Sequence, residues 1–308
     1  MKNVLVVGSS NTDMIIRVPR IPRPGETVLG GEFSMAAGGK GANQAVAAAR
    51  AGGRVTFVAR VGDDDFGARA LAAFEAEGID TRFVVRAPAS PSGIALITVD
   101  ERGENSISVA SGANALLSAA DVAAAGDAFA AADIVLVQLE SPLATVEAAV
   151  RKAGEKGVPV VLNPAPARPL ADDLLRRVAV LTPNEHEAEL LAGVPVRDEE
   201  GAREAAARLR TRGPAAVIVT LGERGVYASA GGFEGPVPAF KVEPVDTTAA
   251  GDVFNGALAV ALAEARPLEE ALRFAQAAAA ISVTRPGAQP SAPTRAEIED
   301  FLPIPRCF

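Results

Sequence analysis

The stretch AAGGKGANQAVAAA, residues 36–49, passes from a glycine-rich loop directly into an alanine-rich helical segment. A lysine after glycines suggests a phosphate loop, whose pattern G-x-x-x-x-G-K-[ST] surrounds phosphate with backbone N–H groups and places a hydroxyl on Mg²⁺. The first glycine of that pattern falls on Ser34, and the residue after the lysine is Gly41. Both ends of the pattern fail, so this loop must bind something other than a nucleotide phosphate.

Outward from this loop, short apolar runs alternate with alanine-rich helical segments. The runs show no strict polar alternation, which is typical of strands buried on both faces. They are VLVVGSS, VTFVARVG, DIVLVQLE, VPVVLNPAP, VAVLTPNE and AAVIVTLG. Several of the helical stretches between them, such as GANQAVAAARAG, end on glycine, a common C-terminal stop. This order predicts an α/β fold, a three-layer α/β/α sandwich with a mostly parallel central sheet.

Two insertions interrupt this alternation. Residues 14–36 are punctuated by Pro and Gly and hold two strand-like pieces, and residues 92–112 form a hairpin pattern around DERGEN. Both fall near sheet ends, where ligands bind in open α/β folds, so we expect a small β-sheet lid. Ordinary surface decoration is the alternative. Because no low-complexity linker or repeat divides the chain, we expect one domain, residues 1–308, that carries this lid.

Composition limits the possible functions. The chain has 308 residues, of which 49% are hydrophobic and 22% charged, as in folded globular proteins. Its net charge of -8 argues against a general affinity for nucleic acid or anionic membranes. His186 is the single histidine and Cys307 the single cysteine, which excludes histidine triads, cysteine nucleophiles and Cys/His metal centres. Proton transfer must use a carboxylate, a lysine or Tyr227.

The sequence also bears on the compartment. One cysteine cannot form an internal disulfide bond, and the apolar run in MKNVLVVGSSNTD is too short for a signal peptide. No stretch approaches the ~20 apolar residues that a membrane span requires. We therefore expect a cytoplasmic protein.

The strongest local signal is DTTAAGDVFNGALAVALAEA, residues 246–265. Its small residues allow the backbone N–H groups of 249–252 to converge at a helix start, where the helix dipole also favours an anion. Asp252, in the first turn, has two interpretations. Carboxylates commonly stabilise helix starts. Alternatively, Asp252 is a general base beside a bound phosphoryl group and takes a proton from an attacking hydroxyl.

Several motifs together carry a family resemblance. AAGGKGANQAVAAA and DTTAAGDVFNGAL resemble the two signature regions of the ribokinase-like carbohydrate kinases. GSSNTD, QLESP, LTPNEHEAELL, VTLGERGV and AAAAISVTRPGAQPS occur in the order and spacing of that family, over nearly the whole chain. The resemblance implies the fold of that family and an ATP-dependent sugar kinase with Asp252 as general base. Its most specific implication is phosphorylation of D-ribose at the 5-hydroxyl.

The resemblance assigns the glycine-rich loop to the sugar. Glycines let the backbone approach a polyol, while lysine and asparagine offer hydrogen-bond donors. Asn11 and Asp13 are expected at the end of the first strand, where turn formation is their alternative role. Glu140 ends DIVLVQLE, and its alternative role is a cap on the following helix. The shared position of all three at strand ends favours a site. The expected sugar ligands are Asn11, Thr12, Asp13, Gly39, Lys40, Gly41, Ala42, Asn43, Glu140 and Asp252.

The resemblance places ATP across the C-terminal half of the chain. Asn184 and Glu187 would organise Mg²⁺ and phosphate through water, because Mg²⁺ dehydrates reluctantly. Gln276 occupies the position that flanks the adenine, whereas His186 is expected on a helix surface without a ligand role. The expected nucleotide residues are Asn184, Glu187, Thr220, Leu221, Gly222, Glu223, Arg224, Gly225, Ala249, Ala250, Gly251 and Gln276.

The resemblance further implies a K⁺ site and a homodimer through the lid. Most of the cation ligands would be backbone carbonyl oxygens, and oxygen ligands with one carboxylate suit a large monovalent ion better than Mg²⁺. Alternatively, Asp246 makes only turn hydrogen bonds to Thr248 and Ala249. The cation positions are Asp246, Thr248, Ser282, Arg285, Gly287 and Ser291.

Other functions stay open at this point. A kinase of the same family could act on deoxyribose, fructose, a keto-deoxy sugar acid or a nucleoside, and a difference of one hydroxyl is beyond the sequence. A non-catalytic sugar- or nucleotide-binding regulator is a second alternative, which the intact AAGD motif disfavours. A Rossmann dehydrogenase, suggested by VVGSSNTD, lacks G-x-G-x-x-G after the first strand.

Overall fold

The computed structural model describes residues 1–302 and is built around a nine-stranded sheet. The strand order is β13-β12-β11-β10-β9-β8-β1-β4-β5. All neighbours from β11 to β5 pair in parallel, and only β12 and β13 add antiparallel pairs at one edge. The prediction of an α/β fold with a mostly parallel sheet is confirmed.

The strands of this sheet are apolar because helices cover both faces. In β1, Val4 and Val6 pack into one buried cluster while Leu5 and Val7 pack into the other. The strands are β1 (Asn3–Val7), β4 (Arg54–Gly62), β5 (Asp80–Ala87), β8 (Ile134–Val137), β9 (Val160–Leu162), β10 (Val180–Leu181), β11 (Ala216–Thr220), β12 (Val226–Ala230) and β13 (Phe233–Val237).

The helices divide between the two faces according to the buried clusters they join. One cluster includes side chains from α1 (Lys40–Arg50), α2 (Asp65–Ala76), α9 (Ala250–Ala263), α10 (Leu268–Val283) and α11 (Arg295–Phe301). The other includes α3 (Ala119–Ala124), α4 (Gly126–Ala131), α5 (Leu143–Glu155), α6 (Asp172–Leu175), α7 (Glu185–Ala192) and α8 (Glu199–Thr211). Single 3₁₀ turns occur at η1 (Gly112–Leu116), η2 (Gly222–Arg224) and η3 (Gln289–Ser291). The result is the expected three-layer sandwich.

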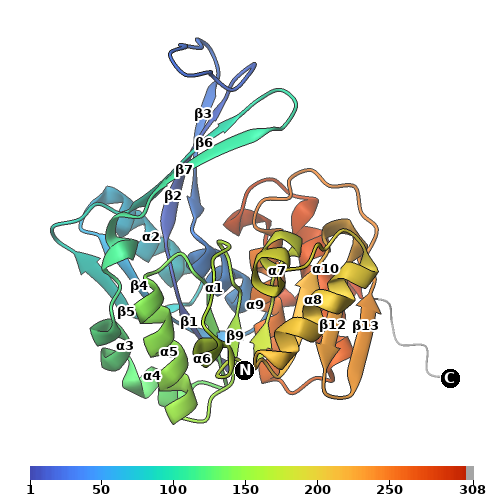
Figure 1. Ribbon diagram of the computed structural model, residues 1–308. Helices are drawn as coiled ribbons and strands as arrows, with labels where there is room; N and C mark the ends of the chain where they lie inside the picture. Colours follow the sequence, from blue (N-terminus) through green and yellow to red (C-terminus); the bar gives the residue numbers. More distant parts are fainter. Residues whose placement is uncertain (303–308) are drawn as a thin grey trace.

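A second, four-stranded sheet of order β3-β2-β6-β7 projects from the body as a lid (Figure 1). Its strands are β2 (Asn11–Arg17), β3 (Glu32–Gly38), β6 (Gly93–Val99) and β7 (Asn105–Ala110). The lid sheet reaches further toward the body than the expected insertions, since β2 starts at Asn11 and β3 ends at Gly38. Asn11 and Asp13 therefore lie on a lid strand, and the expectation that they end the first strand, β1, is wrong.

Helices α1 and α9 cross in close contact at Gly256. A Cβ atom at Gly256 would lie 2.7 Å from Ala47 Cβ and from Gln44 O, and 2.8 Å from Ala48 N. Any side chain at this position would force the two helices apart. Because Gly256 follows Asp252 by one helical turn, this contact brings Asp252 to the first turns of α1.

His186 is exposed on α7, and Cys307 lies outside the described residues. Among residues 1–302, no helix combines the length and apolar character that crossing a membrane requires.

Candidate active site

Asp252 lies in the first turn of α9, against the start of α1. Its Oδ2 accepts a hydrogen bond from Asn43 Nδ2 and its Oδ1 accepts one from Gln44 Nε2, both at 2.9 Å. The residue is 6% exposed. Burial raises the pKa of Asp252, while the charge of Lys40 and the two amide donors lower it. A buried carboxylate held by donors that favour its ionised form is suited to accept a proton.

The start of α9 is suited to an anion. Within the described chain, no side chain caps this helix N-terminus. Ala249, the residue before the helix, adopts a φ of 60°, in the left-handed region that residues other than glycine seldom occupy. The N–H groups of Gly251 and Asp252 belong to the first turn, whose N–H groups have no acceptor inside the helix. A negatively charged group would supply those acceptors and gain from the helix dipole.

Asp13 faces the same region from the lid. Its carboxylate lies over Gly38, where a Cβ atom would overlap both carboxylate oxygens. Burial raises the pKa of Asp13 to about 6, and the negative charges of Glu140 and Asp252 contribute to the increase. The site therefore combines three carboxylates that are close enough to influence one another.

Glu140 connects the loop after β8 to the glycine-rich loop. Its Oε2 accepts hydrogen bonds from Ser9 Oγ at 2.6 Å and from the backbone N–H of Lys40 at 2.9 Å. Glu140 thus caps the N-terminus of α1, whereas the alternative considered from the sequence was a cap on the following helix. Gly39 and Gly41 make this arrangement possible, because Gly39 has a φ of 89° and a Cβ at Gly41 would overlap the backbone of Ser9.

Lys40 is the positive group of the site. The charge of Asp252 raises the pKa of Lys40, and Glu140 and Glu187 act in the same direction against the effect of burial. Its side chain lines a cavity of about 210 Å³ together with Asp252 and Glu187. The structure therefore places Lys40 beside the start of α9, and its assignment to the sugar stays a prediction.

The same cavity gathers eight of the predicted residues from several elements. Asn184 caps α7 and Glu187 completes a capping box with it, while Thr220 at the end of β11 lies beside Asn184 in a parallel bridge. Glu187 is 4% exposed, and burial raises its pKa. The predicted residues that line the cavity are Lys40, Asn184, Glu187, Thr220, Ala249, Ala250, Gly251 and Asp252.

The other predicted nucleotide residues lie outside this cavity. Arg224 pairs with Glu185 at 2.7 Å and donates to the carbonyl of Arg197 at 3.1 Å. Gln276, on α10, is 5% exposed and its Nε2 donates to the carbonyl of Val237 at 2.7 Å. The predicted residues that the cavity does not include are Leu221, Gly222, Glu223, Arg224, Gly225 and Gln276.

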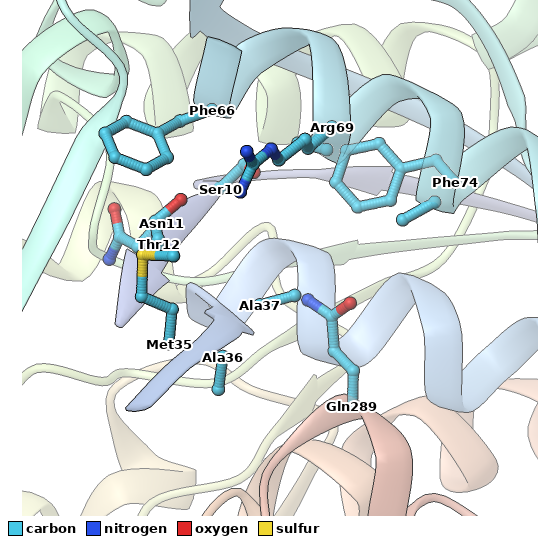
Figure 2. Close-up of a pocket in the computed structure, with 12 residues that line it drawn as sticks. Ser10, Asn11, Thr12, Met35, Ala36, Ala37, Phe66, Arg69, Phe74 and Gln289 are labelled. Atoms are coloured by element: carbon cyan, nitrogen blue, oxygen red, sulfur yellow. The ribbon is translucent and has the colours of Figure 1, made fainter. Parts of the chain in front are cut away.

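A second cavity, of about 280 Å³, lies between α2 and the base of the lid (Figure 2). Asn11 and Thr12 line it, together with Phe66, Arg69 and Phe74 from α2. Its lining does not include Asp13, Asn43, Glu140 or Asp252. Ala42 lies in neither lining and is fully buried in α1.

Of the predicted cation residues, Asp246 joins its own loop to the loop of Gly287. Asp246 Oδ1 accepts a hydrogen bond from the N–H of Thr248 at 2.9 Å, and Oδ2 accepts one from the N–H of Gly287 at 2.8 Å. Ser282 and Ser291 direct their hydroxyls to local carbonyls, and Arg285 pairs with Glu297 at 2.6 Å. Asp246 therefore does more than form a turn, since it also accepts a hydrogen bond from Gly287 in the second loop.

Sequence reasoning missed a set of buried amides around Asp252. Gln44 donates a hydrogen bond to Asp252. Asn163 and Asn255 line the cavity together with Asp252. Asn163 follows β9 directly, and the rule that singled out polar residues at strand ends would have found it. Gln44 gave no such signal because it lies inside a helical run.

These features are compatible with a carbohydrate kinase, and comparison with known proteins shows that class. Residues 1–295 match the pfkB family of carbohydrate kinases, and the chain belongs to this family. The resemblance inferred from the motifs is confirmed.

The similar proteins within the family are sugar kinases. The chain is 48% identical to the ribokinase of Haemophilus influenzae over 98% of each sequence. It is 38% identical to the deoxyribokinase of Salmonella typhimurium over 98% of this chain and 99% of that one. The ribokinase of Arabidopsis thaliana, solved with ribose and ATP, superimposes with a TM-score of 0.89 at 33% identity, covering 97% of this chain and 98% of that one.

Proposed function

We propose that this protein transfers the γ-phosphoryl group of ATP to the 5-hydroxyl of D-ribose, giving D-ribose 5-phosphate and ADP. The observation that carries this proposal is Asp252, a buried carboxylate in the first turn of α9 that is close enough to the lid carboxylate Asp13 to raise its pKa. Membership of the pfkB family and 48% identity to a ribokinase support the choice of substrates.

The sugar would bind where the lid meets the glycine-rich loop. Asp13 and Glu140 offer carboxylate oxygens, and a polyol supplies the hydroxyl donors that such acceptors need. Asn11 Oδ1 already accepts a hydrogen bond from Asn114 Nδ2 at 2.7 Å, which leaves its amide N–H groups oriented as donors to a sugar oxygen. A sugar lacking a matching hydroxyl would leave buried polar groups unpaired, so we expect discrimination.

Asp252 would act as the general base. It takes the proton of the 5-hydroxyl while that oxygen bonds to the γ-phosphorus, and the bond from this phosphorus to the β–γ bridging oxygen breaks to release ADP. Lys40 and the N–H groups at the start of α9 stabilise the negative charge on the transferring group. The lid covers the sugar and excludes water, which would otherwise compete as acceptor.

Mg²⁺ would accompany ATP at the edge of this cavity. Glu187 is a buried carboxylate beside Lys40, and Asn184 donates to it through both its backbone N–H and its side chain, at 2.9 and 3.0 Å. Mg²⁺ dehydrates reluctantly and usually keeps several bound waters. A fixed carboxylate of this kind is suited to accept hydrogen bonds from those waters. When bound, Mg²⁺ neutralises phosphate charge.

K⁺ would bind between the two loops that Asp246 joins. The residues fit such an ion because Arg285 and both serine hydroxyls are turned to local partners, leaving the carbonyl oxygens of these loops as ligands. A bound K⁺ would order residues 246–251 and so preorganise the start of α9. Activity that is equal in K⁺, Na⁺ and a bulky organic cation would remove this ion from the proposal.

The lid would pair with the lid of a second copy. Its sheet exposes large apolar side chains, which solvent disfavours. They are Ile16, Phe33, Met35, Leu96, Ile107 and Val109, between 40% and 63% exposed. We propose a homodimer of one-domain kinases working in the cytoplasm, and sedimentation that gives a monomer at micromolar and higher concentrations would refute the dimer.

An ADP-release assay over a panel of sugars tests the function. With Mg²⁺, ATP and K⁺ present, D-ribose should give the highest kcat/KM, ahead of 2-deoxy-D-ribose, fructose and adenosine. A better rate with one of those acceptors would change the substrate while keeping the kinase. Sugar binding without ADP release would instead favour a non-catalytic sugar-binding regulator.

A further inference from the structure

Two primary amides donate hydrogen bonds to Asp252, and each amide can donate only when its NH₂ group faces the carboxylate. Asn43 Nδ2 and Gln44 Nε2 donate to its two oxygens, both at 2.9 Å. An amide turned by half a rotation would instead present its carbonyl oxygen to the carboxylate. Two oxygens facing each other in a buried site repel, so something must fix which way these amides point.

The orientation of Gln44 is fixed by its neighbours. Gln138 Nε2 donates to Gln44 Oε1 at 2.6 Å, so the carbonyl oxygen of Gln44 is kept on the side away from Asp252. On the other side, Gln44 Nε2 also donates to Asn163 Oδ1 at 3.1 Å. Rotating the Gln44 amide would break all three of its hydrogen bonds at once.

Of the two groups that orient Gln44, Asn163 is held by a further hydrogen bond. Asn163 Nδ2 donates to the carbonyl of Thr182 at 3.1 Å, which directs Asn163 Oδ1 toward Gln44. Gln138 is oriented by its bond to Gln44 alone, because its Oε1 is buried without a hydrogen-bond partner among the described residues. Gln138 follows β8, and its Oε1 lies where a Cβ atom of Gly8 would overlap it, so the glycine makes room for this side chain. Gln44 and Gln138 are 0% and 1% exposed, which shields these bonds from competing water.

We propose that Gln44 and Gln138 are positioning residues for the base, in which Gln138 sets the amide orientation of Gln44, and Gln44 holds the carboxylate of Asp252 in one rotamer and favours its acceptor form. This inference rests on the proposed function in taking Asp252 as the general base. Neither glutamine is among the residues that line the two cavities, so both would act only through Asp252.

Other charged groups also face Asp252 and must stay constant in any test. Lys40 favours the ionised carboxylate, whereas Glu140 disfavours it, and both belong to other elements. Asp13 from the lid and Glu187 from α7 are close enough to be influenced by Asp252. Leucine at positions 44 or 138 removes amide donors and adds no charge, so it leaves these four groups unchanged.

The experiment compares Gln44→Leu and Gln138→Leu with a matched control, Thr145→Val. Thr145 is 2% exposed and its hydroxyl donates to the carbonyl of Leu117 at 2.6 Å, so the control also loses a buried hydrogen bond. The Asp252 carboxyl is titrated by ¹³C NMR with labelled aspartate, assigned by the signal missing in Asp252→Asn. The pH dependence of kcat with D-ribose and the melting temperature are measured on the same proteins.

Loss of the Gln44 donor should raise the pKa of Asp252 by ~1–2 units, because a hydrogen bond to an ionised group is being removed. The acid limb of kcat should move to higher pH by a similar amount, and kcat at neutral pH should fall by ~10-fold or more. Gln138→Leu should shift both quantities in the same direction by about half as much, because Gln44 keeps its donors but loses its fixed orientation. Thr145→Val should lower the melting temperature and move neither.

Unchanged titration of Asp252 in both leucine variants, with only a lower melting temperature as in the control, would overturn the positioning role. A shift in Gln44→Leu alone would overturn the part assigned to Gln138. The NMR titration needs no turnover, so a wild-type protein that fails to phosphorylate ribose would refute the proposed function and leave this result readable.

Discussion

The floor of the active site and the lid above it hold their carboxylates in different ways. On the floor, Asp252 has hydrogen bonds to both oxygens from a helix that Gly256 keeps in close contact. In the lid, Asp13 has a pKa of about 6 that is set by burial and by neighbouring carboxylates, on a sheet whose Phe33 is 63% exposed and Leu96 56%.

This difference separates two tasks. The floor places the base before any substrate arrives, because its donors come from the protein itself. In the proposed function, the lid carboxylate gains its partners when sugar hydroxyls bind. Changes on the floor should therefore act mainly on turnover, and changes in the lid should act mainly on sugar affinity.

The largest effect is expected for Asp252→Asn. The amide keeps the size of the side chain but cannot accept the proton, so kcat should fall by ~10²–10⁴-fold. The dissociation constant for D-ribose, measured by calorimetry without ATP, should change little. Near-normal turnover would return Asp252 to the role of stabilising a helix start.

The next effect is expected where the two helices cross. In Gly256→Ala, the added Cβ would lie 2.7 Å from Ala47 Cβ, so α9 must move away from α1. Overpacking of this kind costs ~1–3 kcal/mol, and a displaced Asp252 should lower kcat by ~10-fold. Gly154→Ala is the control, because a Cβ at Gly154 meets nothing within 4 Å. Equal behaviour of the two variants would mean that this contact does not set the site.

The titration of the lid carboxylate Asp13 should make sugar binding depend on pH. Sugar hydroxyls donate to the ionised form of Asp13, whose pKa is raised to about 6. Affinity for D-ribose should therefore increase as pH rises through about 6 and level off above it, with a slope of up to ~10-fold per pH unit on the acid side. Calorimetry on wild type and Asp13→Asn checks this, since the variant should bind more weakly and lose the dependence. A variant that keeps the same pH profile would assign it to another group.

The smallest effect is expected at Ala249. Its φ of 60° is strained for alanine and open to glycine, so Ala249→Gly should relieve ~0.5–1 kcal/mol at this position. The greater freedom of glycine in the unfolded chain offsets part of this gain. Thermal unfolding should show an equal or slightly higher midpoint, with turnover unchanged within ~3-fold. A clear loss of stability would mean that the left-handed backbone is not a source of strain.

The sequence predicted the architecture because the signal was repeated along the chain. Six apolar runs alternating with helical segments indicate a parallel sheet regardless of any single error in their bounds. The position of Asn11 and Asp13 was predicted less well. The break between β1 and β2 is the short segment GSS, residues 8–10, and local pattern alone does not show that the chain enters a different sheet there.

The sequence predicted the site residues whose charge and motif make them stand out. It missed the residues whose role depends on packing between distant segments. Asp252 and Lys40 stand out as charged residues in small-residue motifs, and the structure brings both to one cavity. Gln44 and Gln138 gain their roles only from the crossing of α1 and α9 and from the space above Gly8. Gln138 directly follows β8, so the rule on polar residues at strand ends would have marked it. Its contact with Gln44 joins distant segments, and no local spacing predicts that contact.

The most direct measurement of the central claim is the proton-coupled ³¹P NMR spectrum of the product formed from D-ribose and ATP. Floor and lid together decide which hydroxyl meets Asp252, so the position of the phosphate reports how the sugar is held. The account predicts one new monoester signal split by the two protons of a primary carbon, with one ADP formed per monoester. A signal split by a single proton, from phosphate on the anomeric carbon or on a ring hydroxyl, would contradict it, as would ATP consumption without a sugar monoester.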